Sequence, residues 1–163
     1  MAWLTRRQHA IGHLNALART TPDTFILFGA DSCHHGGALR PSPWIHLPKI
    51  LRPSPYSEPP FKPGTSFSGQ KIVDDIHPHH AWDQPFYQTY VDAWDRNTTD
   101  IVDTVGKLIE FDARHDTFVV IAHDTPLKNI VNLFPKKAND WKKKGWKEQG
   151  RWQFLKSYKG ALA

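Results

Sequence analysis

Hydrophobic side chains gather in a few short runs along the chain, and the first strong run lies at Thr24–Ala30. Pro22 and Asp23 precede this run and a polar dipeptide follows it, so turn-forming residues bound it on both sides. The pattern therefore predicts a β-strand over residues 24–30. The segment His13–Thr20, one turn earlier, is the expected hairpin partner of this strand.

A helix that leads into a second strand is predicted in the C-terminal half. Asn97-Thr98-Thr99 offers N-caps, and the apolar residues that follow recur on one face of a helix: Ile101, Val102, Val105, Leu108 and Ile109. Thr117–Ala122 comes next, rich in Phe, Val and Ile, as a buried strand would be. A helix that feeds a buried strand is typical of an α/β fold.

Another helix is predicted after this strand. Pro126 occupies the place of its first turn, and apolar residues continue it to Pro135: Leu127, Ile130, Val131 and Phe134.

A long Pro-rich loop, residues 40–70, interrupts these elements. Eight prolines lie between Pro41 and Pro63, which excludes regular structure over most of the stretch. Two interpretations stay open. The loop is either mobile or wrapped around the core, with its aromatic residues as anchors: Trp44, Tyr56, Phe61 and Phe67.

Composition bounds the class of protein. The 163 residues suit a single domain, here residues 1–163, and 39% of them are hydrophobic. No apolar run approaches the roughly 20 residues of a membrane span, and residues 1–8 have no apolar segment typical of a secretory signal. Because the single Cys33 cannot form an internal disulfide, we expect a cytoplasmic protein.

The net charge of +5 belongs to a basic, Trp-rich C-terminal segment, residues 136–163. From Lys136 to Lys159 there are nine Lys and Arg residues against Asp140 and Glu148, and aromatic rings lie between them. The segment could bind a phosphate backbone while its rings stack on bases. The favoured interpretation is a terminal lobe whose aromatic rings pack inward while its lysines face water, since no nucleic-acid motif accompanies the charge.

Three polar residues stand at the ends of predicted strands: His13, Asp31 and His123. Imidazole nitrogens ligate zinc, and a carboxylate can bridge two ions, so these side chains could form a metal cluster if the fold brings them together. Histidines beside strands also serve as hydrogen-bonded structural residues, and the spacing alone does not decide between the two roles.

Five segments carry a resemblance to a known family: His9-Ala-Ile-Gly-His13-Leu, Phe25-Ile-Leu-Phe-Gly-Ala-Asp31, Val120-Ile-Ala-His123-Asp124, the stretch from Cys33 to Ser42 and the stretch from Phe134 to Trp146. They resemble the third, fourth and fifth motifs and further stretches of the metallo-β-lactamase superfamily, closest to its lactonase-like branch. The resemblance implies the second half of the family's αββα sandwich, and it makes His9 a turn residue.

The resemblance implies a chemistry as well. His13 and His123 would each bind one of two zinc ions, Asp31 would bridge them, and a zinc-activated water would hydrolyse a small ester or lactone. His34 stands three residues after the bridging Asp, where related lactonases have a Tyr, and it could serve as a catalytic acid or electrophile. Alternatively, His34 and His35 only cap the loop with hydrogen bonds.

One family hallmark, the H-x-H-x-D-H motif, is absent from the sequence. His77-Pro-His79-His80 comes nearest but lacks the Asp, and we interpret it as a solvated turn. We therefore expect a truncated chain that is inactive alone, with a partial or empty zinc site and an uncovered sheet face that favours self-association. The rival hypothesis is a non-catalytic remnant or binding module that uses the basic segment.

Other nucleophiles do not suggest a different enzyme. Ser32 has no triad context, and Cys33 without a matched base is expected to be a small buried residue.

Overall fold

The computed structural model describes residues 2–6, 13–88 and 98–162. Its elements in chain order are β1 (Ala2–Arg6), β2 (His13–Thr21), β3 (Thr24–Ala30), the 3-10 turn η1 (Gly36–Ala38), β4 (Ile50–Leu51), β5 (Phe67–Ser68), α1 (Gly69–Asp75), α2 (Thr98–Ala113), β6 (Thr117–Ile121), η2 (Thr125–Asn129), α3 (Trp146–Gly150) and η3 (Gln153–Ala161). The turn predicted at His9 and the N-cap at Asn97 lie outside the described residues.

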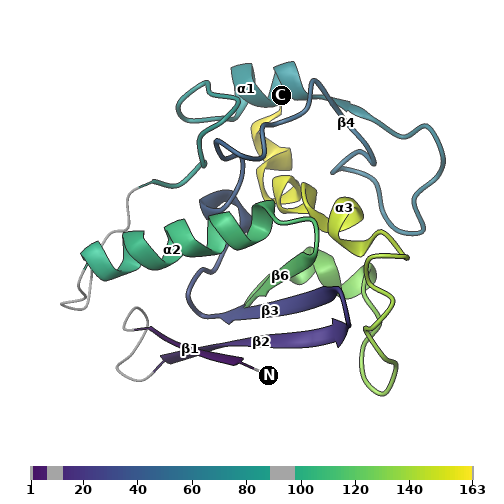
Figure 1. Ribbon diagram of the computed structural model, residues 1–163. Coiled ribbons are helices and arrows are strands. Elements are labelled where there is room, and N and C mark those ends of the chain that lie inside the picture. Colours follow the sequence, from purple (N-terminus) through teal and green to yellow (C-terminus); the bar gives the residue numbers. More distant parts are fainter. Residues whose placement is uncertain (1, 7–12, 89–97, 163) are drawn as a thin grey trace.

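A four-stranded sheet, in the order β1-β2-β3-β6, forms the base of the molecule (Figure 1). The strands β1, β2 and β3 are antiparallel neighbours, whereas β6 runs parallel to β3. This confirms the strands predicted at 24–30 and 117–122, the hairpin and the mixed α/β class. The second half of an αββα sandwich is a finer statement that stays a prediction.

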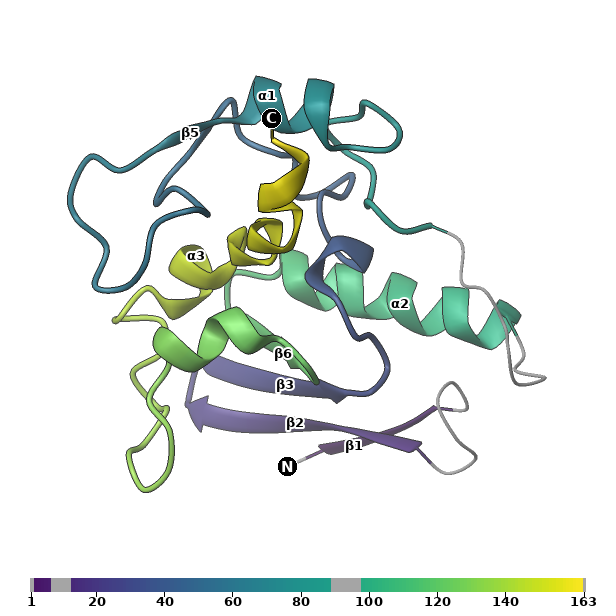
Figure 2. The same ribbon diagram turned by 180° about the vertical axis from the view of Figure 1, so that it is seen from behind.

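Alternation along the strands separates two sets of apolar side chains. On one face, Leu17, Leu27 and Val119 pack against α2 through Val105 and Leu108. Both views show α2 crossing above the sheet, so the predicted helix is confirmed and its apolar stripe forms the core (Figures 1 and 2).

The described residues cover the opposite face of the sheet only in part. Ile26 and Phe118 are buried there against Trp141 and Trp146. Farther along the same face, Leu14 and Phe28 are each 43% exposed. The C-terminal segment thus covers one end of this face and leaves the other end in contact with solvent.

The Pro-rich loop wraps around a second core above α2. Leu47 and Leu51 are buried with Trp152 and Phe154 of the C-terminal segment, and β4 pairs with β5. Ordered wrapping is therefore the interpretation that the structure supports. Of the predicted anchors, Tyr56 and Phe67 pack against this core, Phe61 is half-buried, and Trp44 is 60% exposed.

The helix predicted from Pro126 to Phe134 is wrong in type and length, because only the 3-10 turn Thr125–Asn129 forms. Leu127 is buried beside Gly150, where a side-chain Cβ would come within 2.4 Å of the leucine methyl. This close contact fixes the turn against α3, and the chain beyond Val131 bends away so that Trp141 can be fully buried.

A buried ion pair connects the loop to the helix layer. Arg40 donates to both carboxylate oxygens of Asp112, at 2.7 and 2.8 Å, and to the carbonyl of Arg151 at 2.9 Å. Although burial alone would raise the pKa of Asp112, the guanidinium of Arg40 holds that pKa below its ordinary value.

Across the described residues, no helix is long and apolar enough to cross a membrane.

Candidate metal centre

The site lies where the parallel strands β3 and β6 end. Because the carboxyl ends of parallel strands meet at one edge of a sheet, Asp31 after β3 and His123 after β6 become neighbours. The N–H of Ala122 donates to the carbonyl of Ala30 at 2.8 Å and extends the pairing to the last residues before the site.

Both strands end in an unusual backbone conformation. Ala30 has φ of 44° and His123 has φ of 63°, a left-handed region that residues with a Cβ rarely adopt. Such conformations cost about 1–3 kcal/mol each and persist only where the surrounding structure holds them, often at functional sites. Here they turn Asp31 and His123 toward one another at the sheet edge.

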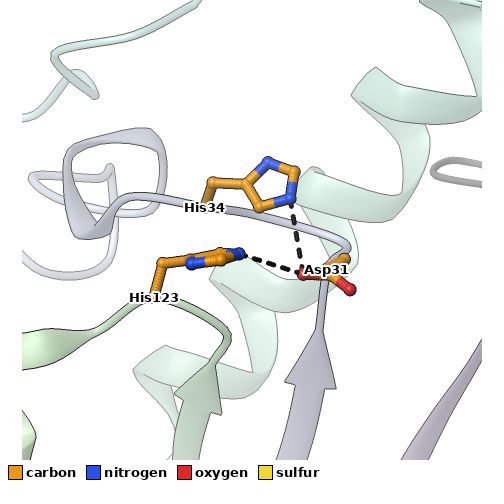
Figure 3. A group of neighbouring side chains, drawn as sticks. All are labelled: Asp31, His34 and His123. Carbon is orange, nitrogen blue, oxygen red and sulfur yellow. Dashed lines mark ion pairs between the residues drawn. The ribbon is translucent and has the colours of Figure 1, made fainter.

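Asp31 faces the imidazole rings of His34 and His123 (Figure 3). Its Oδ1 is 3.5 Å from Nε2 of His34 and 3.5 Å from Nε2 of His123. The three ligand atoms all lie within 4.8 Å of one another. The side chains of Asp31, His34 and His123 are 37%, 50% and 69% exposed, so a solvent ion can reach them.

This donor set fits a transition metal. Ligand atoms at about 2.0–2.2 Å from a tetrahedral zinc ion are about 3.3–3.6 Å apart, which is close to the two Asp–His distances observed. One carboxylate oxygen with two imidazole nitrogens is a combination that zinc accepts. The rings of His34 and His123 lie 5.3 Å apart and are tilted by 52°.

His13, the third ligand that the resemblance implies, lies beside this group. Its Nδ1 is 3.5 Å from Oγ of Ser32, and that hydroxyl donates to Oδ1 of Asn15 at 2.9 Å. Of the residues described, only Asp31, His34 and His123 gather as a possible metal-binding group. The structure therefore brings together two of the three predicted ligands, places His13 beside the group, and adds His34.

His35 fixes the turn that carries Asp31 and His34. Its Nδ1 accepts the N–H of Gly37 at 3.0 Å, so Nε2 carries the proton that it donates to Oγ of Ser157 at 3.1 Å. Burial lowers the pKa of His35, which favours the neutral ring that this pattern needs. One alternative predicted that His34 and His35 cap the loop with hydrogen bonds. His35 has this role.

A pocket of about 180 Å³ opens beside the three ligands. It is lined by His34, His35, Gly36, His123, Asp124, Thr125, Pro126, Phe154 and Ser157. Gly36 is required at this position, because a Cβ there would lie 2.9 Å from the ring of Phe154. Phe154 and Ser157 of the C-terminal turn η3 line one side of this pocket, a contribution that no local sequence pattern indicates.

Other candidate residues have structural roles. Cys33 is buried as expected, and burial raises the pKa of its thiol to about 11. The solvated turn predicted at His77 is wrong for that residue: His77 is 1% exposed, and its Nε2 lies 2.8 Å from the carbonyl oxygen of Gln84. His79 and His80 are exposed.

The basic segment has its aromatic rings inside. Trp141, Trp146 and Trp152 are 0%, 4% and 7% exposed, so few rings remain for stacking on bases. Lys147 is an exception among the lysines. It is 2% exposed and donates to the carbonyls of Arg114 and Thr117 at 2.5 and 2.6 Å, and burial lowers its pKa to about 8.

Comparison with known proteins gives three informative relatives. Gamma-lactamase FDB1 of Fusarium pseudograminearum is 43% identical over 90% of this chain and 35% of its own length. Metallo-hydrolase mfmC of Annulohypoxylon moriforme is 38% identical over 94% of this chain and 39% of its own length. Cytochrome P450 monooxygenase mpaDE of Penicillium roqueforti is 35% identical over 94% of this chain but only 16% of its own length.

The chain thus spans about a third of the gamma-lactamase and the metallo-hydrolase that it matches. No family model and no solved structure matches it. Over about 90% of its length, the chain is homologous to part of the fungal gamma-lactamases and of a metallo-hydrolase of the metallo-β-lactamase superfamily.

Proposed function

We propose that this chain is the part of a metal-dependent hydrolase that carries Asp31, His123 and one wall of the substrate pocket. The substrate is a small cyclic ester or amide, the metal is zinc, and the domain is the second half of an αββα sandwich. The observation that carries the proposal is the pocket of about 180 Å³ directly beside the Asp31–His123 pair. The names of a gamma-lactamase and a metallo-hydrolase among the relatives support it.

The residues around the pocket favour attack by water over attack by a side chain. A bound zinc ion would supply an acidified water and polarise the carbonyl group of the substrate. Ser32 is 6% exposed, and its hydroxyl donates a hydrogen bond to Oδ1 of Asn15. Burial raises the pKa of the Cys33 thiol to about 11. Neither residue is therefore an activated nucleophile. Asp31 would hold the ion, and the imidazole of His123 would fix its position.

The pocket limits the size of the substrate. Drug-sized ligands occupy pockets of about 300–1,000 Å³, and this pocket is smaller. Phe154 and Pro126 offer apolar contacts, whereas Ser157 and Thr125 offer hydroxyl groups. A five- or six-membered lactone or lactam with a short substituent fits this combination, and a long acyl chain does not.

Binding of the ring-opened product tests this function without requiring turnover. We expect 4-hydroxybutyrate and 4-aminobutyrate, the products of the simplest lactone and lactam, to bind the zinc-loaded chain and to shift the NMR signals of His123. The signals should return when a chelator removes the metal, because the product carboxylate would occupy the open metal position. Butanol is the control that lacks the carboxylate. Zinc-loaded protein that binds neither product would contradict the proposal.

We also propose that the chain self-associates through the open end of the sheet face, where Leu14 and Phe28 are each 43% exposed. Burying a large apolar side chain contributes about 1.5–3 kcal/mol, so Phe28→Lys should weaken a dimer at least about tenfold. Sedimentation velocity over a concentration series measures this change.

Phe134→Lys is the matched control for self-association, because Phe134 is 96% exposed in another region of the surface. Equal behaviour of the two variants, or a wild-type chain that stays monomeric, would show that the face does not associate.

A further inference from the structure

His34 stands in the same relation to Asp31 as His123 does. In both residues the Nε2 atom faces the same carboxylate oxygen, Oδ1 of Asp31, at the same distance of 3.5 Å (Figure 3). An ion placed between the three groups would meet two imidazole nitrogens and one oxygen. The resemblance to lactonases suggested an acid or electrophile at position 34, but the geometry here is that of a ligand.

The backbone on both sides of His34 is anchored by hydrogen bonds of its neighbours. Cys33, on one side, is 4% exposed and its thiol donates to the carbonyl of His35 at 3.2 Å. On the other side, the ring of His35 forms hydrogen bonds with the N–H of Gly37 and the hydroxyl of Ser157. Because both neighbours are fixed, His34 needs little reorganisation to bind an ion, and such support is what orients metal ligands in proteins.

Three protein ligands with a fourth position open to water are the usual composition of a catalytic zinc site. We propose that His34 is a metal ligand and that Asp31, His34 and His123 together hold one zinc ion with this chain's residues alone. The inference rests on the proposed function for the identity of the metal. It differs from the two-ion arrangement implied by the family resemblance, because His13 is not among the ligands.

Metal titration of the full 163-residue chain tests the assignment. Isothermal titration with Zn²⁺, and visible absorption with Co²⁺ as a spectroscopic probe, should give one ion per chain. His34→Ala and His123→Ala should each weaken zinc binding at least about tenfold, because removal of a ligand costs more than the 10–100-fold lost with a supporting residue. Both side chains are half-exposed or more, so the fold should survive the substitutions, and circular dichroism checks this.

His79→Ala is the matched control, because His79 is exposed and lies outside the group. Its zinc affinity should equal that of the wild type, and His13→Ala should change the affinity less than twofold. The assignment is overturned if His34→Ala binds zinc as tightly as the wild type, or if two ions bind and His13→Ala weakens one of them. If one ion binds through His34 but no product binds to it, the proposed function fails and this inference stands.

Discussion

Replacement of Asp112 by Ala is expected to lower the free energy of unfolding by about 3–5 kcal/mol, the cost of leaving one charge of a buried pair without its partner. Arg40 is 5% exposed and Asp112 is 0% exposed, so water cannot solvate the guanidinium once the carboxylate is gone. A single domain is stable by about 5–15 kcal/mol, so the variant should lose a large share of its stability. Urea denaturation followed by circular dichroism measures the change.

Two further variants separate burial from charge. Asp103→Ala removes an ion pair with Lys107 on the same helix, but both side chains are exposed, so its effect should be below about 1 kcal/mol. The double variant Arg40→Met/Asp112→Leu replaces both charges with apolar groups and should recover most of the lost stability. Equal free energies of unfolding for Asp112→Ala and Asp103→Ala would show that the buried pair contributes no more to stability than an exposed one.

Acid should weaken the same interaction in the wild type. The pKa of Asp112 is lowered in the folded state, so the unfolded state binds a proton first as the pH falls. The stability that the pair contributes is therefore fully present above the unfolded pKa of about 4 and is lost as the pH falls through the folded value. Asp112→Asn should show a flatter loss of stability in this acidic range.

The sequence predicts the elements around the site well because their signals are local. The strand at residues 24–30 and the strand after α2 are apolar runs bounded by turn residues, and the structure has both, with the hairpin partner of the first, at nearly the predicted bounds. The residues that end the two parallel strands are then brought together by topology alone. Asp31 and His123 could be predicted as neighbours for this reason.

The remaining features depend on contacts between residues far apart in the chain. Arg40 and Asp112 form a pair across 72 positions, and Ser157 reaches His35 across 122. In the sequence, Lys147 does not differ from the other lysines of the basic segment. In the structure its ammonium group is buried and donates to two backbone carbonyls. The place of His34 beside Asp31 could not be predicted either, because it depends on the turn that the hydrogen bonds of Cys33 and His35 hold.

We expect the purified 163-residue chain to hydrolyse lactones no faster than zinc in buffer, because it supplies too few ligands for the two-ion site that the resemblance implies. Two four-coordinate zinc ions that share a carboxylate and a water need about five more ligands. The described part of the chain places His34 and His123 beside Asp31, and His13 is the one further ligand that the resemblance implies.

A single ion in this site would be held weakly, because its ligands are exposed to solvent. Its ligands are 37–69% exposed, so water competes for the metal and screens its charge, and a loosely held ion acidifies its bound water poorly. Uncovered walls would also leave the substrate carbonyl in bulk solvent, where electrostatic stabilisation of the transition state is small. Binding of metal and product is therefore expected without turnover.

A pH-stat assay of γ-butyrolactone hydrolysis with saturating zinc measures this directly, and elemental analysis of the same sample gives the number of ions bound. His123→Ala is the control, since it removes a proposed ligand and should show the same background rate as the wild type. Zinc-dependent turnover in the wild type that disappears in His123→Ala would contradict the prediction and would show that the three ligands of this chain suffice for catalysis.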